Sequence, residues 1–541
     1  MKKTASPYPV LWGLSVASAV MLSLPWLVPH AGFFALVGLV PLLCAEYIAT
    51  GASVKRFWIW HYSTFVLWNA FTTFWVCNAT VGGGIFAVLA NALQMSLVFG
   101  LFRLARKRLK GVIPYIFLAA AWIAWERWYL TSAQISWPWL VLGNAFATNI
   151  RDIQWYSVTG TLGGSLWVWC ANLGIFGALV SLAEGKWRKW NGKARAAAVT
   201  ALALVLIGPF VCSAVMYNSY RERSEGKVSI LVGQPNLDPY KKFESMTQSQ
   251  QNELLLGLFA DSLRNGHPKL LVAPETVTFD VFLNDIPSSP TWDRFHEFLQ
   301  DYPGTDMLFG ASTYDYYNTR SAPGLLSYPY RNGWLVSHNS ALMLAPDGRT
   351  EVFHKSKLVV GTEMTPYPKF FVPLDNWLSK YLNGGKPMIA RDTGQKEISL
   401  LHLSDGTPLG CAVCYESVYG EYCTGYVNKG AKFLAVITND SWWGNTPGYR
   451  QHLSYSCLRA LELRRDIVRC GNSGISGFID QRGEMVQEGP WWEETVMRGE
   501  VNLNSEKSFF ARHGDITGRV NTLVFLLLMA LLIVRLLPGR K

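Results

Sequence analysis

The sequence predicts a multi-pass α-helical membrane domain joined to a soluble α/β domain. Half of the 541 residues are hydrophobic and only 16% are charged, a balance typical of neither a disordered chain nor an ordinary soluble enzyme. Long apolar runs fill much of 9–217 and recur at 520–537, whereas 227–510 has globular levels of charged and turn residues. We therefore expect a seven-helix membrane domain at 1–217, an extracytoplasmic α/β domain at 218–512, and a final helix with a cytoplasmic tail at 513–541.

Eight apolar stretches reach the roughly 20 residues that a helix needs to cross the hydrocarbon of a bilayer. They lie near 9–27, 31–49, 57–77, 83–102, 113–130, 163–183, 196–216 and 520–537. The basic start before the first stretch is also typical of a cleaved signal peptide. Pro25, Trp26 and Pro29 occupy the place where small residues would mark cleavage, so the sequence favours an uncleaved first span.

The basic residues predict the orientation of these spans. A net charge of +11 would suggest nucleic acid in a soluble protein, but the excess lies in short segments at 2–3, 55–56, 103–110, 186–195 and 535–541. With the amino terminus in the cytoplasm, all five segments lie on the cytoplasmic side, as the positive-inside rule requires. An even number of spans then places both termini in the cytoplasm and residues 217–519 outside it, and no nucleic-acid partner is expected.

The soluble part alternates short β-rich segments with amphipathic helices, which predicts a layered α/β sheet. Turn residues at Pro346-Asp347-Gly348 and Ser404-Asp405-Gly406 indicate two hairpins. The predicted strands are 228–232, 269–273, 306–311, 340–344, 351–354, 398–403, 409–413, 433–438, 467–470 and 477–480. The predicted helices are 245–265, 290–301, 417–429 and 447–465.

Reactive side chains stand at the ends of three predicted strands. Glu275 follows Pro274, Lys355 ends a hairpin arm, and Cys414 ends an apolar strand that we expect to open into a helix. A helix dipole there would favour the thiolate, a carboxylate could act as base, and an ammonium could stabilise an oxyanion. The trio suits acyl transfer, although a buried Cys, a surface Lys and a strand-end Glu are each ordinary.

The order Pro-Glu, Lys, Cys-Tyr-Glu resembles the nitrilase superfamily, whose Glu-Lys-Cys triad sits in an α-β-β-α sandwich. Further similar motifs are Asn439-Asp440-Ser441-Trp442-Trp443-Gly444, Arg459-Ala460-Leu461-Glu462 and the run from Arg469 to Gly477. Seven preceding spans and one following span are similar to the membrane-embedded apolipoprotein N-acyltransferase family within that superfamily. The resemblance covers nearly the whole chain.

The resemblance implies a role for each matching residue. Cys414 is expected to be the nucleophile, Glu275 the general base and Lys355 the oxyanion-stabilising group. Glu363, Tyr415, Glu416, Phe243 and Trp442 are expected to support catalysis or bind substrate. Ala273 departs from the family's usual Trp before Pro-Glu, and Phe243 stands where the family has a Trp, so the acyl-chain pocket is expected to differ.

The family's reaction implies the partners. A phospholipid such as phosphatidylethanolamine would acylate Cys414, and the thioester would then pass its acyl chain to the α-amino group of an S-diacylglyceryl-cysteine that begins an apolipoprotein. The resemblance implies a monomer in the bacterial inner membrane with a periplasmic catalytic domain and no cofactor. The scattered His residues predict no metal site.

Several alternatives stay open. A membrane-tethered amidohydrolase would use the same triad with water as acceptor, and a transporter or receptor would only bind ligand and tolerate loss of Cys414. A papain-like pair of Cys414 with His452 is a third, and Cys411-x-x-Cys414 invites a redox or zinc reading. We expect Cys411, Cys457 and Cys470 to be core residues, with Cys423 undecided. Residues 370–382 are either an amphipathic arm at the membrane surface or a loop packed on the domain.

Overall fold

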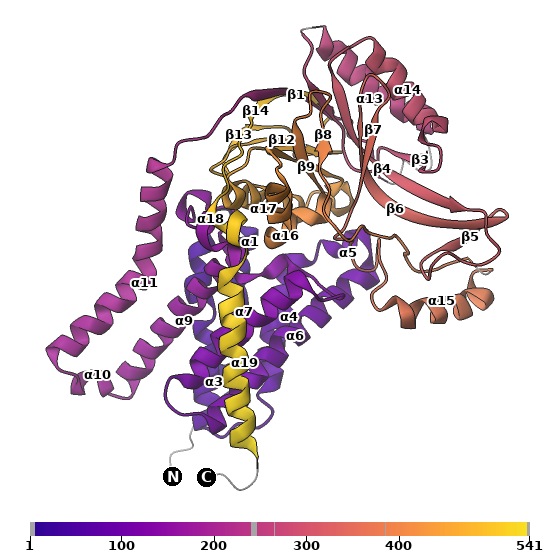
Figure 1. Ribbon diagram of the computed structural model, residues 1–541. Helices are drawn as coiled ribbons and strands as arrows, with labels where there is room; N and C mark the ends of the chain where they lie inside the picture. Colours follow the sequence, from indigo (N-terminus) through magenta and orange to yellow (C-terminus); the bar gives the residue numbers. More distant parts are fainter. Residues whose placement is uncertain (1–5, 240–245, 265, 385, 538–541) are drawn as a thin grey trace.

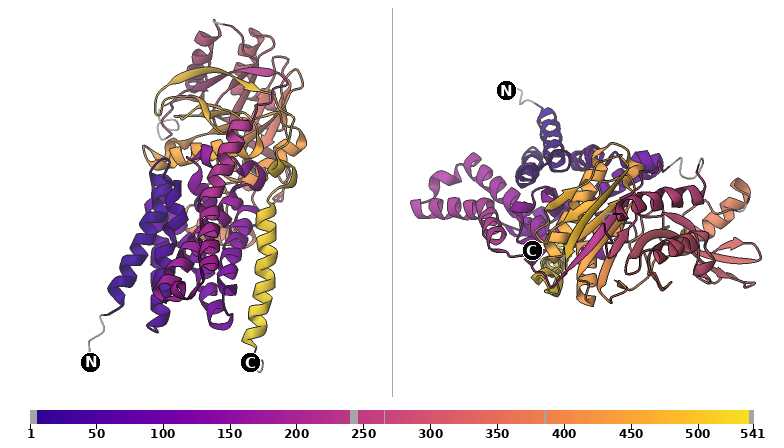
Figure 2. Two further views of the ribbon diagram at one scale, coloured as in Figure 1. Left: turned by 90° about the vertical axis from the view of Figure 1, so that its left-hand side faces the viewer. Right: turned by 90° about the horizontal axis from the view of Figure 1, so that it is seen from above.

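The computed structural model describes residues 6–239, 246–264, 266–384 and 386–537. It has two parts: a bundle of long helices that contains both ends of the described chain, and an α/β domain stacked on one end of the bundle (Figure 1). The chain leaves the bundle through α11 (Gly192–Ser219), builds the α/β domain, and returns through α19 (Ile516–Leu536), which packs along α7 (Ile113–Thr131). The two ends therefore lie close to the same end of the bundle (Figure 2).

Six helical stretches among the described residues are long and apolar enough to cross a membrane. They are α1 (Tyr8–Leu27), the nearly continuous stretch Gly32–Gly51 that includes α2 (Ala35–Gly38) and α3 (Val40–Gly51), α6 (Val81–Arg108), α9 (Thr161–Ala183), α11 and α19. Their apolar side chains are extensively exposed in the isolated chain, above all on α11 and α19. A surface of this kind requires lipid around it.

Two of the eight predicted spans are not both long enough and apolar enough to be counted with these six. The α4 helix (Trp58–Thr73) has 16 residues, about 24 Å at 1.5 Å per residue, and is followed by the short helix α5 (Val76–Ala79). The α7 helix is longer, but it carries Glu126 and Arg127 and many Trp and Tyr residues. Both helices pack inside the bundle, α4 between α1 and α6 and α7 against α6, α9 and α19, so their partners cover much of their surface.

The α/β domain contains two mixed β-sheets in the described chain. The first follows the order β14-β1-β2-β4-β6-β5, with β3 and β7 joined to β4 and β6, and the second follows β13-β12-β11-β10-β9-β8. The bounds of the first sheet's strands are β1 (Lys227–Gln234), β2 (Leu270–Val272), β3 (Thr278–Phe282), β4 (Asp306–Tyr317), β5 (Tyr328–Tyr330), β6 (Gly333–Leu344), β7 (Thr350–His354) and β14 (Thr495–Asn502). Those of the second are β8 (Leu401–His402), β9 (Pro408–Val413), β10 (Phe433–Thr438), β11 (Ile467–Gly471), β12 (Gly477–Ile479) and β13 (Met485–Glu488).

Alternation of side chains along the strands builds four layers. On β1, Ile230 and Val232 face the second sheet and join one core, while Leu231 joins another core with α13 (Gln248–Leu263) and α14 (Pro290–Gln300). Helices α16 (Gly420–Lys429) and α17 (Pro447–Leu463) cover the outer face of the second sheet. Since successive side chains of a strand point to opposite faces, both faces of each sheet are buried in an α-β-β-α arrangement.

All ten predicted strands and all four predicted helices of this domain are confirmed, with shifted ends. Local chemistry explains the helix starts: Thr247 and Gln250 form a capping box before α13, and Thr446 caps α17 ahead of Pro447. The sequence analysis missed β3, β5, β13 and β14. The segment expected to be an arm or a loop contains α15 (Pro368–Leu382).

One glutamine joins the α/β domain to the membrane bundle. From α17, the Gln451 side chain donates to the carbonyl oxygens of Trp26 at 3.0 Å and Thr72 at 3.2 Å. Its own oxygen accepts from the indole N–H of Trp139 at 2.6 Å and of Trp75 at 3.3 Å. These buried bonds connect α17 to α1, to α4 and its continuation, and to the 131–142 loop, so they fix how the two parts are seated on each other.

Candidate active site

The three predicted catalytic residues lie together at the ends of neighbouring strands. Glu275 follows β2, where the main chain of β4 holds the turn: the N–H of Gly310 donates to the carbonyl of Pro274 at 3.0 Å. Lys355 follows β7, and its N–H donates to the carbonyl of Asn339 on β6 at 2.8 Å. Cys414 follows β9. Residues up to 139 positions apart in sequence thus line one cavity.

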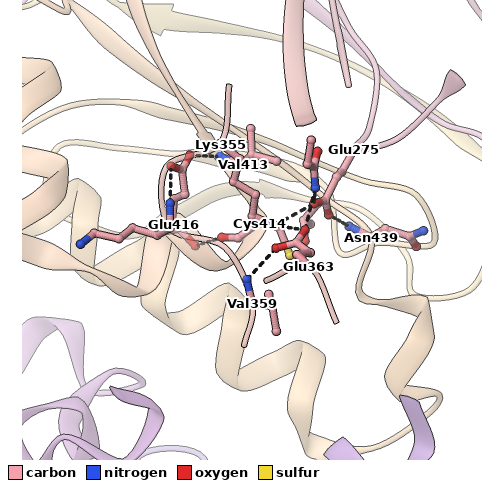
Figure 3. A network of polar contacts seen from close by, with 12 residues as sticks. Glu275, Lys355, Val359, Glu363, Val413, Cys414, Glu416 and Asn439 are labelled. Atoms are coloured by element: carbon pink, nitrogen blue, oxygen red, sulfur yellow. Dashed lines mark hydrogen bonds and ion pairs between the residues drawn. The ribbon is translucent and has the colours of Figure 1, made fainter. Parts of the chain in front are cut away.

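Two carboxylates and two nitrogen donors form the centre of this site (Figure 3). Lys355 Nζ lies 3.0 Å from Glu275 Oε1 and 2.7 Å from Glu363 Oε1. The same two oxygens accept from Asn339 Nδ2, each at 2.8 Å. The remaining oxygens are bonded to main chain: Glu275 Oε2 accepts from the N–H of Asn439 at 3.1 Å, and Glu363 Oε2 from that of Val359 at 2.7 Å.

Burial and this charge arrangement act on the pKa values in opposite directions. Burial alone would lower the pKa of Lys355, but the carboxylates of Glu275 and Glu363 raise it well above its ordinary value. Burial also raises the pKa of Glu363, against the lowering effect of Lys355. Lys355 is therefore a fixed ammonium, since its charge is compensated on both sides.

Cys414 stands at a sharp turn of the chain, with a φ of +51°. Non-glycine residues rarely adopt this left-handed conformation, and it costs about 1–3 kcal/mol where the surroundings impose it. A 3₁₀ turn over Cys414–Val418 follows, and α16 begins only at Gly420. The strand thus opens into a 3₁₀ turn and not directly into the expected α-helix. Burial, followed by the charge of Glu275, raises the pKa of the Cys414 thiol well above its ordinary value. A neighbouring base is needed to remove the proton.

Of the expected supporting residues, some line the cavity and one is buried behind it. Tyr415 and Trp442 line the cavity beside Cys414, and the Tyr415 ring stacks on Trp137 at 6.0 Å between centroids. Glu416 is fully buried behind the turn. It accepts from the N–H groups of Ser356 at 2.7 Å and Val413 at 2.9 Å, so it ties the Lys355 segment to the Cys414 segment. Phe243 lies outside the described residues.

The cavity has a volume of about 630 Å³ and its walls come from both halves of the chain. The soluble half contributes Glu275, Lys355, Glu363 and Cys414, and α6 contributes an apolar floor with Gly83, Phe86, Ala87 and Ala90. Trp139 lies 4.9 Å from Trp75 and 5.2 Å from Trp137, measured between ring centroids, and Trp75 lies 4.5 Å from Trp443. The cavity thus combines charged groups from the α/β domain with apolar and aromatic walls from the membrane bundle.

His452 contacts Cys414 through the main chain. Its Nε2 lies 3.1 Å from the carbonyl oxygen of Cys414 and 3.0 Å from the hydroxyl of Ser417, while its Nδ1 lies 2.8 Å from Asp440. This arrangement favours Glu275 over His452 as the base for the thiol. Ligand atoms of Cys414, Asp440 and His452 lie within 4.8 Å of one another, but the guanidinium of Arg469 is 2.6 Å from Asp440. That cation already compensates the carboxylate that a metal would need.

None of the nine cysteines forms a disulfide; all nine lie in the described residues. Cys411, Cys457 and Cys470 are buried as expected, and so is Cys423. Cys411 and Cys423 belong to the core between the two sheets and α16. Of the pair Cys411 and Cys414, only Cys414 lines the cavity in the described chain.

The sequence analysis did not identify Asn339, nor Trp137 and Trp139, as residues that line the cavity. Asn339 belongs to an unremarkable His-Asn-Ser triplet within a strand, and nothing in the local pattern distinguishes it. Trp137 and Trp139 flank a proline in the loop between the predicted spans 113–130 and 163–183. Two tryptophans around Pro138 in such a loop were a usable signal, since large aromatic residues at a membrane interface often have one apolar and one polar contact.

Gly310 allows the Glu275 turn to approach β4. A Cβ at this position would lie 2.6 Å from both the Cα of Glu275 and the N of Thr276, so we expect Gly310→Ala to displace the carboxylate and to reduce enzymatic activity at least about tenfold. Overpacking of this kind costs about 1–3 kcal/mol of stability. Thermal unfolding and the reaction rate, measured on the same preparation, check both effects.

The matched control is Gly257→Ala in α13, where nothing lies within 4 Å of the added Cβ. This variant should keep the wild-type reaction rate and should be slightly more stable, because alanine is favoured in helices. A folded Gly310→Ala protein that is as active as wild type would show that the close approach does not position Glu275.

Comparison with known proteins covers both halves of the chain. Residues 244–509 match the carbon-nitrogen hydrolase family, and residues 18–174 match the apolipoprotein N-acyltransferase N-terminal domain. The chain is 28% identical to the apolipoprotein N-acyltransferase of Chlorobaculum tepidum over 522 residues, which cover 95% of this chain and 93% of that protein. It is 26% identical to that of Geobacter metallireducens, over 93% of this chain and 91% of that protein.

The N-terminal-domain match comes first along the chain and the hydrolase match second. The relatives align along more than nine-tenths of the chain, and the aligned region includes the cavity in which Glu275, Lys355 and Cys414 meet. The chain belongs to the apolipoprotein N-acyltransferase family.

Proposed function

We propose that this protein N-acylates the α-amino group of the S-diacylglyceryl-cysteine that begins an apolipoprotein, with a phospholipid as acyl donor. The observation that carries the proposal is the shared cavity: a cysteine, a carboxylate and a buried ammonium face a space whose floor is the apolar helix α6. An enzyme that uses these groups on a water-soluble substrate needs no such apolar floor. A lipid substrate does, because its chains must remain out of water while its ester reaches the sulfur.

The first half-reaction forms a thioester. Glu275 takes the proton from Cys414 as the sulfur attacks the ester carbonyl of the phospholipid, and Lys355 Nζ with the main-chain N–H of Tyr415 holds the oxyanion. The C–O bond then breaks, Glu275 returns the proton to the departing glycerol oxygen, and lysophospholipid leaves. Glu363 keeps Lys355 charged and in place throughout, since it lies 2.7 Å from Nζ.

The second half-reaction transfers the acyl chain to the amine. The free α-amino group attacks the thioester carbon, Glu275 accepts one of its protons, and the C–S bond breaks. The proton then returns to the Cys414 sulfur. The mechanism requires that water stays out until the amine arrives, because hydrolysis would waste the thioester. The tryptophans at 137, 139 and 443 line the cavity beside the thiol, Trp75 packs against two of them, and this aromatic cluster serves the purpose.

The α15 helix is a candidate membrane contact at the rim of the cavity. Its exposed face carries Phe370, Phe371, Leu374, Trp377, Tyr381 and Leu382, while a buried ion pair between Asp375 and Arg391, 2.5 Å long, holds the other face to the domain. Pro366, two residues before the helix, lines the cavity. Insertion of this face into the headgroup region would bring lipid chains to the rim.

The proposed topology has eight spans, with α4 and α7 counted because other helices enclose them. Both termini would be cytoplasmic and the α/β domain periplasmic in the bacterial inner membrane, with domains at 1–217, 218–512 and 513–541. The basic segments at 103–110 and 186–195 lie at the far ends of α6 and α9 from the α/β domain, which supports this orientation. We propose a monomer that needs no cofactor and accepts phosphatidylethanolamine.

Intact-protein mass spectrometry tests the proposal. The purified protein incubated with phosphatidylethanolamine should gain the mass of one acyl chain, and hydroxylamine should remove it. Addition of a diacylglyceryl-cysteine peptide should discharge the adduct and yield the N-acylated peptide. Free fatty acid as the main product would favour an amidohydrolase-like enzyme with water as acceptor. Absence of any adduct on folded protein, with the lipid intact, would favour a binding protein.

A further inference from the structure

The amide nitrogen of Asn339 donates two hydrogen bonds, whereas its amide oxygen has no hydrogen-bond partner in the described chain. It lies on β6, is 5% exposed, and lines the cavity. Its Nδ2 donates to Glu275 Oε1 and to Glu363 Oε1, each at 2.8 Å. Because both donors are used, the amide cannot be reversed without placing its oxygen against two carboxylate oxygens. Asn339 Oδ1 is buried and has no hydrogen-bond partner in the described part of the chain.

A buried acceptor without a partner is destabilising, and native proteins rarely keep one. Here the unpaired oxygen is on the same amide group as the nitrogen that bonds Glu275. The proposed general base and the free acceptor are therefore side by side on the cavity wall. A ligand that satisfies Asn339 Oδ1 must bring an N–H or O–H group to within reach of the base.

The proposed function offers one such group at the reacting centre. The ester carbonyl of a phospholipid has neither N–H nor O–H, so it leaves Asn339 Oδ1 unpaired in the first half-reaction. A neutral primary amine has two N–H groups and a lone pair. If one N–H points to Glu275 and the other to Asn339 Oδ1, the lone pair is directed away from both and can face the thioester carbon.

We propose that Asn339 Oδ1 accepts an N–H of the attacking α-amino group and thereby selects a primary amine as the acyl acceptor. The inference rests on the proposed function and concerns only its second half-reaction. The proton balance is unchanged: the C–N bond forms, the C–S bond breaks, and Glu275 carries one proton from nitrogen to sulfur. Asn339 gives up no proton and only orients the amine.

The test compares two acceptors on a pre-formed thioester. Wild type and Asn339→Ala are first acylated with phosphatidylethanolamine, and discharge is then timed with a diacylglyceryl-cysteine peptide and with its N-methyl analogue, which has one N–H fewer. In wild type the primary amine should react roughly tenfold faster, the size of one well-placed hydrogen bond. In Asn339→Ala this ratio should fall close to one, whatever the absolute rates.

Two further variants keep the test decisive. Ser340→Ala changes the next residue of β6, whose hydroxyl bonds Thr313 and His354 away from the cavity, and should keep the wild-type ratio. Asn339→Asp retains an acceptor oxygen and should also prefer the primary amine, even if its acylation is slow. An unchanged ratio in Asn339→Ala would overturn the inference, as would loss of the ratio in Ser340→Ala.

Failure of the proposed function has a different signature. In that case no thioester forms on the wild-type protein, or it discharges to free fatty acid with neither peptide acylated. A thioester that forms normally and reacts with both acceptors in the same ratio in wild type and Asn339→Ala would leave the two-step transfer intact and remove only the role of Asn339.

Discussion

Replacement of Cys414 by alanine should abolish acyl transfer. The variant has no sulfur to attack the ester, and no other cysteine lines the cavity in the described chain. Loss of a covalent nucleophile typically costs well over 1000-fold in turnover, so we expect no acyl adduct and no N-acylated peptide above background. The measurement is intact mass together with peptide product after incubation with phosphatidylethanolamine.

Cys170→Ser is the matched control, since Cys170 is an exposed residue of α9 away from the cavity. It should acylate like wild type. Transfer at an undiminished rate by Cys414→Ala would mean that the amine attacks the phospholipid directly, and the Glu275–Lys355 pair would then act without a covalent intermediate.

Lys355→Met should have a comparably large effect, through both chemistry and charge. The ammonium is 1% exposed and lies between two carboxylates, so the variant loses the proposed oxyanion donor and leaves Glu275 and Glu363 facing each other. We expect acylation of Cys414 to fall at least about 1000-fold. Removal of one partner from a buried ion pair costs about 3–5 kcal/mol of stability.

The stability loss in Lys355→Met should depend on pH. Burial already raises the pKa of Glu363 and Lys355 opposes that rise, so without the lysine the carboxyl binds its proton more tightly when folded than when unfolded. Such a group stabilises the fold at low pH and loses that contribution as pH rises through its folded pKa. The unfolding temperature should therefore fall further below wild type at pH 8 than at pH 5.

Lys357→Met provides the comparison for this variant. Its ammonium lies over the rings of Tyr419 and Tyr422, 5.2 and 5.6 Å from their centroids, and does not line the cavity. It should keep most of the acylation activity and show no extra pH dependence. Equal damage from both lysine variants would indicate that the segment, and not the Lys355 charge, is essential.

Much of the fold was predictable because local patterns and the tertiary structure agree. The strand ends at Glu275, Lys355 and Cys414 interrupt apolar runs with charged or nucleophilic groups, and in an α/β sheet such ends gather at one edge. The order of the three residues then indicated one superfamily. The hairpin turns at Gly348 and Gly406, with φ of +85° and +82°, were equally visible in the sequence.

What the sequence could not predict depends on neighbours that are distant along the chain. The thiol of Cys414 was expected beside a helix dipole, but its surroundings are set by burial and by Glu275. Asn339 can be identified as a site residue only when β6 is known to lie beside the turns that carry Glu275 and Glu363, because its side chain bonds both carboxylates. Two predicted spans, α4 and α7, are surrounded by other helices, and a hydropathy pattern does not report which face of a helix is covered by protein.

The bonds made by Gln451 affect which residues control hydrolysis of the acyl group and which control its transfer. Through this side chain the soluble half is fixed against Trp75 and Trp139, and Trp139 is part of the wall that the membrane bundle gives to the cavity. An isolated soluble half would keep Glu275, Lys355 and Cys414 but lack that wall, and bulk solvent would reach any acyl-sulfur bond formed there. We therefore expect Cys414 and Glu275 to determine whether acylation happens, and residues without any reactive group to determine the partition between transfer and hydrolysis.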